Sequence, residues 1–360
     1  MVPDHADPAR RLIVSELQLR DYRSYARLEL GFEPGVVLVV GENGAGKTNL
    51  LESLHVATQG FSPRSRSERD LIRFGEEAAL VRIAGKRGQS PLQLSISLTG
   101  QGKRAAVNGA RLDSAEQLRR TVQTLVFTPD RLAVVKSGPA ARRAYFDRAL
   151  GRLLPARAAL PAEYGAAIAQ RNAALRRVSL GVSARDAIAP WTERVAVLGA
   201  QLVESRHTVL AELEPGFAER LAELGLAGGR LGYDAEPPSV EALEARLDRD
   251  VDRGATGIGP HLDDVTIAAA GRELRSFGSQ GEQRLAVLAL LLAEAEWLAI
   301  RGPAPLLLLD DVLSELDRGR RATLAARVEG MGQTVITATA AGALPTEPAQ
   351  LVEVVPGAAR

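Results

Sequence analysis

The stretch VVLVVGENGAGKTN, residues 36–49, decides the fold class. Its first five residues form a continuous apolar run, which predicts a strand buried on both faces. Residues 41–48 match the pattern G-x-x-x-x-G-K-[ST] of a phosphate-binding loop. The apolar-rich segment TNLLESLHVAT then predicts a helix. A strand, a glycine loop and a helix in this order indicate an α/β protein that binds a nucleoside triphosphate.

The residues of the loop are expected to have different roles in binding ATP and Mg²⁺. Glycines let the backbone turn tightly and approach phosphate oxygens. Lys47 is expected to reach the β- and γ-phosphates and to act in catalysis, and the Thr48 hydroxyl to ligate Mg²⁺. The predicted ATP-binding residues are Gly41, Glu42, Asn43, Gly44, Ala45, Gly46, Lys47, Thr48 and Asn49.

A second acidic element follows the apolar run LLLLDD at residues 306–311. Four leucines predict another buried strand, and its carboxylates stand at the end where open α/β sheets bind ligands. We expect Asp310 to hold Mg²⁺ and Asp311 to polarise the attacking water.

A third element, Ser279–Gln283, has the order S-x-G-x-Q at the start of a long apolar helix. It resembles the signature of the ABC-type ATPases, and SELD further on resembles their D-loop, with Ser314 and Asp317. The resemblance implies a mixed sheet with flanking helices and two ATP molecules held between two chains in a C₂ dimer. The residues expected to contact the ATP of the second chain are Ser279, Gln280, Gly281 and Glu282. The alternative is an ordinary helix start with a capping box.

The middle of the chain differs from both ends. Strand-like alternation disappears after about residue 140, and Ala, Leu, Arg and Glu dominate at helical spacing. Prolines, including Pro215, predict several helices of at most about 25 residues there. We therefore predict an ABC-type head domain from residues 1–130 and 255–360, with a mostly helical insertion at 131–254.

The insertion has an uneven charge distribution. Residues 131–194 contain 12 basic and 4 acidic side chains, and residues 195–254 contain 6 basic and 12 acidic ones. A basic half of this kind is typical of a surface that binds nucleic acid. Aromatic residues are only 4% of the chain, so we expect its arginines to contact the phosphates rather than aromatic side chains to stack on the bases. The alternative is that the arginines pair with the acidic half. The candidates for contact with nucleic acid, such as DNA, are Arg142, Arg143, Arg148, Arg171, Arg176 and Arg177.

The composition limits the location of the protein. The chain of 360 residues has no cysteine, which favours a reducing cytoplasm. Its N-terminus lacks the apolar core of a signal peptide, and no run of about 18 apolar residues predicts a membrane span.

Several blocks together resemble the RecF family of bacterial recombination mediators over nearly the full length. They are LQLRDYRSYARLEL, GENGAGKTNLLESL, SGPAARRAYFD, QRNAAL, GIGPHLDD and LLLLDDVLSELD. The resemblance implies an ATP-dependent DNA-binding protein that is monomeric without ATP and dimerises with it. It also implies a weak DNA-dependent ATPase that acts with RecR and RecO to load RecA at gapped DNA and supports the SOS response.

Two features depart from the ABC pattern. Asp311 stands where these ATPases usually have Glu, and its shorter side chain predicts slow hydrolysis. Thr337 and Thr339 stand where a switch histidine is expected.

Gln123 is a candidate for the Q-loop glutamine, with a solvated loop residue as the alternative. His261 in GIGPHLDD is expected to contact phosphate or DNA, or else to be a structural histidine.

Three other classes fit less well. A transporter subunit has its signature much closer to the phosphate loop than the roughly 240 residues between Gly41 and Ser279. A coiled-coil ATPase needs sustained heptads without proline breaks. A P-loop kinase or GTPase has no need for Ser279–Gln283.

Overall fold

The computed structural model describes residues 12–65 and 67–360. The N-terminal segment without a signal peptide pattern, residues 1–11, lies outside them. The described chain divides into two compact units. The head unit comprises the residues up to Leu132, Glu223–Gly225 and Val287–Arg360, and the helical unit comprises Ala133–Ala222 and Leu226–Ala286.

A mostly parallel sheet forms the centre of the head unit, in the order β15-β14-β3-β13-β12-β8. The apolar runs at 36–40 and 306–309, predicted from the sequence, supply two of its buried strands, β3 and β12. Because the strands from β14 to β8 run parallel, their carboxyl ends meet at one edge. The strands are β3 (Val36–Val40), β8 (Thr124–Phe127), β12 (Leu306–Leu309), β13 (Thr334–Ala338), β14 (Gln350–Val355) and β15 (Ala358–Ala359).

A second sheet of the head unit is antiparallel, in the order β2-β1-β4-β5-β6-β7. Its outermost hairpin turns at Asn108 and Gly109, which both have positive φ, as the Asn-Gly pair predicts. The strands are β1 (Leu12–Tyr22), β2 (Tyr25–Gly31), β4 (Ala78–Arg87), β5 (Ser90–Thr99), β6 (Gly102–Val107) and β7 (Ala110–Arg111).

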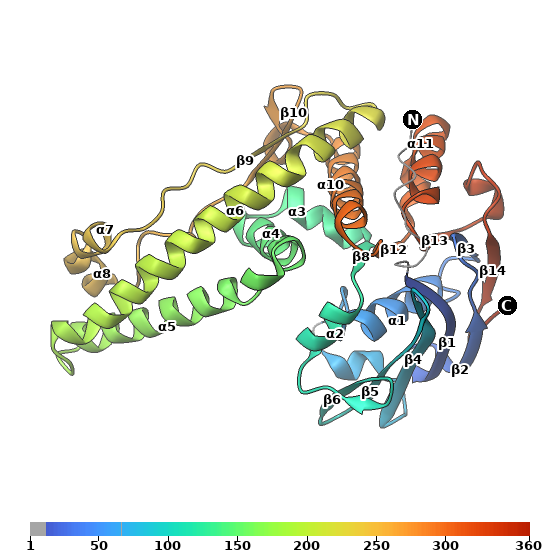
Figure 1. Cartoon of the computed structure of the whole chain (residues 1–360), viewed down its shortest axis with the longest axis horizontal. Coiled ribbons are helices and arrows are strands. Elements are labelled where there is room, and N and C mark those ends of the chain that lie inside the picture. Colours follow the sequence, from blue (N-terminus) through green and yellow to red (C-terminus); the bar gives the residue numbers. More distant parts are fainter. Residues whose placement is uncertain (1–11, 66) are drawn as a thin grey trace. The chain divides into compact units, whose positions relative to one another are not determined.

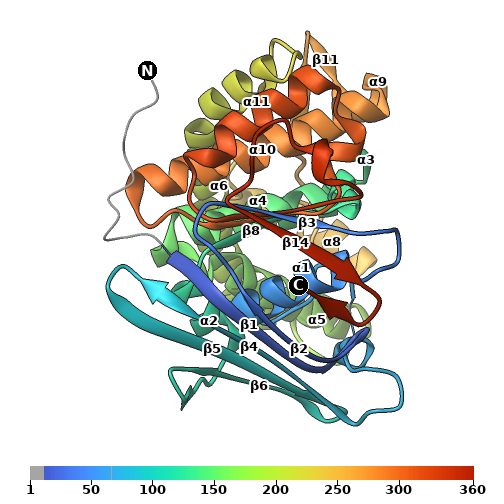
Figure 2. The same cartoon turned by 90° about the vertical axis from the view of Figure 1, so that its right-hand side faces the viewer.

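Helix α1 (Lys47–Gln59) lies between the two sheets and contacts strands of both. Almost all of its residues are buried, and one apolar cluster joins it to both sheets. Helix α11 (Arg318–Glu329) lies on the opposite side of the parallel sheet (Figure 2). The head unit also contains α2 (Ala115–Thr121) and 3₁₀ turns at Glu68–Leu71, Pro129–Leu132, Val312–Glu315 and Ala341–Ala343.

The helical unit contains the two long helices α5 (Leu160–Ser179) and α6 (Ala189–Glu223) (Figure 1). A small sheet, β11-β10-β9, belongs to the same unit. Helix α10 (Gln280–Arg301) begins in this unit and ends in the head unit. The remaining elements are α3 (Ala133–Lys136), α4 (Pro139–Leu153), α7 (Val240–Glu244), α8 (Leu247–Arg253), β9 (Arg230–Gly232), β10 (Thr266–Ala269), β11 (Arg272–Glu273), α9 (Leu274–Phe277) and 3₁₀ turns at Pro155–Arg157 and Arg185–Ile188.

The predicted limit on helix length is wrong. Helix α6 is 35 residues long and continues through Pro215. A proline inside a helix removes one backbone hydrogen bond and kinks the helix or ends it. Here Leu213, Phe217 and Leu221 are buried on both sides of the proline, and their packing holds the helix together across it.

The second domain boundary differs from the predicted one. Residues 255–286 group with the helical unit rather than with the head unit. The reason is pairing within the small sheet, because Thr266 to Ala268 of β10 pair with Arg230 to Gly232 of β9. The strand β11 after Gly271 is only two residues long and is followed by helix α9.

Among the described residues, no helix is both long and apolar enough to span a membrane.

Candidate nucleotide-binding site

The glycine loop lies between β3 and α1, at the carboxyl edge of the parallel sheet. Gly46 caps the helix in a left-handed conformation, with φ 116°. A Cβ atom on this residue would lie 2.9 Å from the Tyr25 hydroxyl, so a side chain is excluded by space as well as by backbone strain. The helix start therefore presents backbone N–H groups, as an anion site requires.

Lys47 is buried, with 9% of its surface exposed, and its ammonium group bonds two neutral carbonyl groups. Nζ donates to the carbonyl oxygens of Gly41 at 2.7 Å and Glu42 at 2.8 Å. No carboxylate of the described residues forms an ion pair with it. A buried cation without a counter-ion, inside a loop of backbone donors, fits the phosphates of a nucleotide.

Thr48 and Asp310 meet at the same edge, although 262 residues separate them in the chain. The Thr48 hydroxyl donates to Asp310 Oδ1 at 3.0 Å, and the Thr337 hydroxyl donates to the same oxygen at 2.8 Å. Burial raises the pKa of Asp310 above its usual range, and these two hydrogen bonds oppose that rise.

These oxygen groups fit Mg²⁺. One hydroxyl and one carboxylate match an ion that takes one or two protein ligands and completes its shell with phosphate and water oxygens. The described residues contain no cluster of three or more His, Cys, Asp or Glu that would suit a more fully protein-bound metal.

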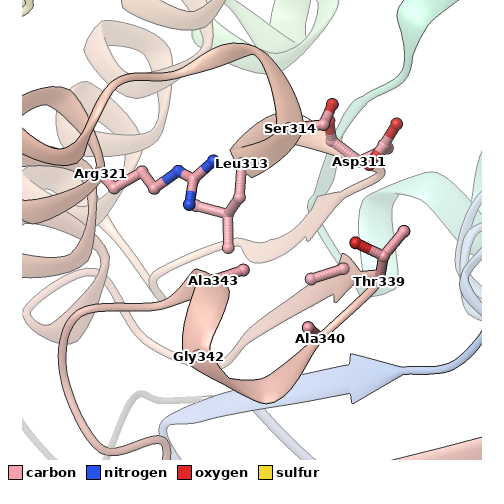
Figure 3. Close-up of a pocket in the computed structure, with 9 residues that line it drawn as sticks. Asp311, Leu313, Ser314, Arg321, Thr339, Ala340, Gly342 and Ala343 are labelled. Carbon is pink, nitrogen blue, oxygen red and sulfur yellow. The ribbon is translucent and has the colours of Figure 1, made fainter.

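Asp311 has an unusual backbone conformation beside this centre, with φ 50° and ψ 29°. Its N–H donates to Thr337 Oγ1 at 2.8 Å, and its carbonyl oxygen accepts from Ser314 Oγ at 2.9 Å. The exposed residue lines a cavity of about 280 Å³, and Thr339 and Arg321 also line it. Figure 3 shows Asp311 and Thr339 together on one side of this cavity, with Arg321 on the other.

The two threonines at the switch position have different surroundings. Thr337 is buried, and its hydroxyl is engaged by Asp310 and Asp311. Thr339 is exposed at the cavity, and its hydroxyl makes no hydrogen bond to the residues that the structure describes. Of the two, only Thr339 has a hydroxyl available to a ligand.

The β1–β2 hairpin supports the loop through residues that sequence reasoning missed. The Tyr25 hydroxyl donates to the Gly46 carbonyl oxygen at 3.1 Å, and burial raises its pKa to about 12. Arg23 donates twice, at 2.9 Å each, to Glu52, which is buried on α1. An acidic residue within the apolar helix pattern was the available signal for this ion pair.

The signature segment forms a reciprocal capping box at the start of α10. The Ser279 N–H donates to the Glu282 carboxylate at 2.7 Å, and the Glu282 N–H donates to Ser279 Oγ at 3.2 Å. The first of these bonds lowers the pKa of Glu282. The predicted alternative, a capped helix start, is thus present in the single chain, and the contact with a second chain's ATP stays a prediction.

The D-loop residues also have local roles. Asp317 is the N-cap of α11 and accepts from the Arg320 N–H at 2.9 Å. Ser314 bonds the Asp311 carbonyl oxygen, as described above.

The Q-loop prediction for Gln123 is wrong. Gln123 precedes β8 at the amino end of the strand, where its carbonyl oxygen accepts from the Leu306 N–H at 2.9 Å. The site lies at the other end, where Phe127 is in register with Leu309 just before Asp310. Four residues of strand separate the two ends by about 13 Å, which is too far for a contact with the nucleotide.

Two of the six DNA-binding candidates are also wrong. Arg142 is buried and donates to both carboxylate oxygens of Asp264 at 2.6 Å. Arg171 is buried and donates to Asp250 and Thr256 at 2.8 Å each. Both side chains are enclosed by the helical unit and cannot contact a phosphate backbone.

The other four candidates are more accessible. Arg143 is half-buried and donates to the Asp263 carbonyl oxygen at 2.6 Å. Arg148, Arg176 and Arg177 are exposed. These last three carry the DNA prediction.

His261 is held inside the helical unit. Its Nδ1 accepts from the Tyr164 hydroxyl at 2.9 Å, and its Nε2–H donates to the Thr256 carbonyl oxygen at 3.1 Å. Burial lowers its pKa, so the neutral ring is favoured. Of the two predicted roles, the contacts match that of a structural histidine.

Comparison with known proteins assigns the family. A family model described as the RecF/RecN/SMC N terminal domain matches residues 13–356. The DNA replication and repair protein RecF of Heliobacterium modesticaldum is 34% identical over 344 residues, covering 91% of this chain and 92% of that protein. The corresponding protein of Anaeromyxobacter dehalogenans is 36% identical over 346 residues, with 90% and 91% coverage. The chain belongs to the RecF family.

Solved structures agree with this RecF assignment. A RecF–ATP structure, of the recombination mediator protein in the RecFOR pathway, has a TM-score of 0.87 at 28% identity and covers 97% of each chain. An Smc head domain from Pyrococcus furiosus, bound to the C-terminal domain of ScpA, has a TM-score of 0.60 at 17% identity, covering 97% of this chain and 95% of that one. That more distant likeness concerns the fold alone. The predicted ABC-type head with a mixed sheet, flanking helices and a helical insertion is confirmed.

Proposed function

We propose that this RecF-family protein is an ATP-dependent DNA-binding protein of recombinational repair. In this proposal two copies dimerise head to tail on ATP, clamp double-stranded or gapped DNA and release it after slow hydrolysis. Lys47, Thr48 and Asp310 carry the proposal, because these three side chains converge at the carboxyl edge of the parallel sheet.

The residues of the site divide the chemistry among them. Lys47 would exchange its two carbonyl partners for the β- and γ-phosphates. Thr48 and Asp310 would hold Mg²⁺, which neutralises phosphate charge when it is bound. Asp311 would orient the attacking water and accept its proton. Its carboxylate is one methylene shorter than the usual Glu, so we expect hydrolysis to act as a timer.

The dimer follows from the signature segment. Ser279 is exposed, and its hydroxyl proton is available for donation while its oxygen caps α10. We propose that Ser279, Gln280, Gly281 and Glu282 of one chain contact the γ-phosphate held by the other. Ser314 and Asp317 would lie near the same interface.

The DNA contacts are expected on the helical unit. Arg148, Arg176 and Arg177 are exposed, and few aromatic residues accompany them. Contacts to phosphates position DNA without reading its sequence. The RecFOR pathway named for the RecF–ATP relative supports RecO and RecR as partners, and the names of the sequence relatives support a setting of DNA replication and repair. RecA loading and a contribution to the SOS response are the finer parts of the proposal. Such a protein works in the cytoplasm, where its DNA is.

ATP turnover measured with and without DNA tests this function. We expect a rate well below roughly 10 per second that rises when duplex or gapped DNA is added. Asp311→Asn should abolish turnover while ATP binding persists, because the loop and Lys47 are unchanged. Fast turnover that DNA does not affect, or no binding of ATP at all, would contradict the proposal.

A further inference from the structure

Thr337 is one of two buried threonines in β13, whose other residues are apolar. It lies near the carboxyl end of β13, between β3 and β12, and only 1% of its surface is exposed. Its neighbours along the strand, Ile336 and Ala338, are buried apolar residues. A buried hydroxyl needs hydrogen-bond partners, so what it bonds shows what it does.

Both partners of Thr337 belong to the acidic pair at the end of β12. The hydroxyl donates to Asp310 Oδ1 at 2.8 Å and accepts from the Asp311 N–H at 2.8 Å. The direction of each bond is fixed, because a backbone N–H can only donate and the one hydroxyl proton is then left for the carboxylate. One side chain thus bonds the carboxylate of the proposed Mg²⁺ ligand and the backbone of the proposed catalytic base at the same time.

Asp311 needs this support. Its left-handed backbone conformation is uncommon for a residue with a side chain. Two side chains hold that conformation, Thr337 at the N–H and Ser314 at the carbonyl oxygen. The conformation turns the chain sharply after β12 and leaves Asp311 at the cavity wall beside Thr339 (Figure 3).

We infer that Thr337 is a positioning residue for ATP hydrolysis, whose hydroxyl fixes Asp310 and Asp311 relative to each other. The inference rests on the proposed ATPase activity. It also separates Thr337 from the missing switch histidine, because a hydroxyl engaged on both sides is not available to the γ-phosphate. Thr339 is left as the residue that can take such a role.

Loss of the hydroxyl should affect hydrolysis more than binding. In Thr337→Val, the Asp311 N–H loses its acceptor and Asp310 keeps only the bond from Thr48. The carboxylate that orients water is then less well placed, while Lys47 and the glycine loop still hold the phosphates. An interaction needed only in the transition state lowers kcat and leaves ground-state affinity unchanged.

The test compares wild type, Thr337→Val and Thr337→Ser. Valine keeps the shape without the hydroxyl, and serine keeps the hydroxyl without the methyl group. Steady-state ATP hydrolysis should fall roughly 10- to 100-fold in the valine variant, as expected for misplaced catalytic groups. Its affinity for a fluorescent ATP analogue should stay within about threefold of wild type, and serine should restore most of kcat.

Three kinetic results would overturn the inference. They are wild-type kcat in Thr337→Val, parallel losses of kcat and affinity, and a serine variant as slow as the valine variant. If valine is not tolerated, Thr337→Ala removes the same hydroxyl. If neither Thr337→Val nor Thr337→Ala folds while Thr337→Ser does, the hydroxyl is needed for stability rather than for positioning. That result also overturns the inference. A wild-type protein that binds ATP but never hydrolyses it contradicts the proposed function as well as the inference. An active wild type with an equally active Thr337→Val variant contradicts only the inference.

Discussion

Lys47 in the head unit and Arg171 in the helical unit are both buried cations, but their partners differ. Lys47 donates to two backbone carbonyl oxygens, and no described carboxylate pairs with it. Arg171 donates to the carboxylate of Asp250, which is itself fully buried, and to two threonine hydroxyls. A buried charge is costly unless it is paired. The helical unit therefore supplies the counter-charge internally, and the head unit leaves it to a ligand.

The same comparison sorts the other arginines of the helical unit. Arg142 and Arg206 form two-bonded pairs with Asp264 and Asp147. Arg206 also donates to the Pro260 carbonyl oxygen at 2.7 Å. These pairs hold the GIGPHLDD segment against α4 and α6, so they are structural. The proposed DNA contacts are therefore limited to the exposed candidates Arg148, Arg176 and Arg177.

The largest expected effect is on stability, in Arg171→Ala. Removal of one partner leaves Asp250 buried and unpaired, which typically costs about 3–5 kcal/mol. Urea unfolding followed by the fluorescence of Trp191, which packs against the same apolar cluster as Leu175, measures this in a Trp297→Phe background. Arg185→Ala is the matched control, because it breaks an exposed pair with Asp248 and should cost at most about 1 kcal/mol. Equal losses in the two variants would contradict the comparison.

Lys47→Ala should show the reverse pattern. Loss of charged hydrogen bonds to phosphate is expected to weaken ATP binding by about 2–3 kcal/mol, or roughly 100-fold. Unfolding should change little, because no buried carboxylate is left without a partner. Isothermal titration with a non-hydrolysable ATP analogue and Mg²⁺ checks the affinity. The exposed Lys86→Ala serves as the control, and an unchanged affinity in Lys47→Ala would remove the basis of the nucleotide site.

The smallest effect is expected for DNA. Arg176→Ala with Arg177→Ala should weaken duplex binding about 3- to 10-fold and reduce the slope of log K against log salt by about one per lost phosphate contact. Fluorescence anisotropy at several salt concentrations measures both. Arg230→Ala, exposed in the same unit, is the control. An unchanged slope in the double variant would move the DNA surface elsewhere.

Contiguous motifs made much of the head unit predictable. Residues 36–49 and 306–311 each contain a buried strand followed by its polar residues, so local sequence implies both element and function. The ABC-type fold followed from these motifs and the signature segment. Asp310 and Thr48 could be paired because parallel strands end at one edge.

Long-range pairing explains what was missed. Arg142 and Asp264 are 122 residues apart, and sequence alone shows neither partner nor burial. In the sequence, Thr337 looks like any threonine of a strand. Its role is visible only in the structure, where β12 is the neighbouring strand and brings Asp310 and Asp311 to its hydroxyl. Gln123 was near the site in chain position but at the wrong end of its strand. Pro215 breaks helices in general, and only the packing around it shows that this helix continues.

The central claim is that ATP joins two chains through Ser279, and analytical ultracentrifugation tests it most directly. The wild-type protein should sediment as a monomer alone and as a dimer with Mg²⁺ and a non-hydrolysable ATP analogue. Ser279→Arg should bind the nucleotide with near wild-type affinity and remain monomeric, because the bulky side chain blocks the contact with the second chain's phosphate. A wild-type protein that stays monomeric at saturating nucleotide, or a Ser279→Arg variant that dimerises normally, would contradict the account.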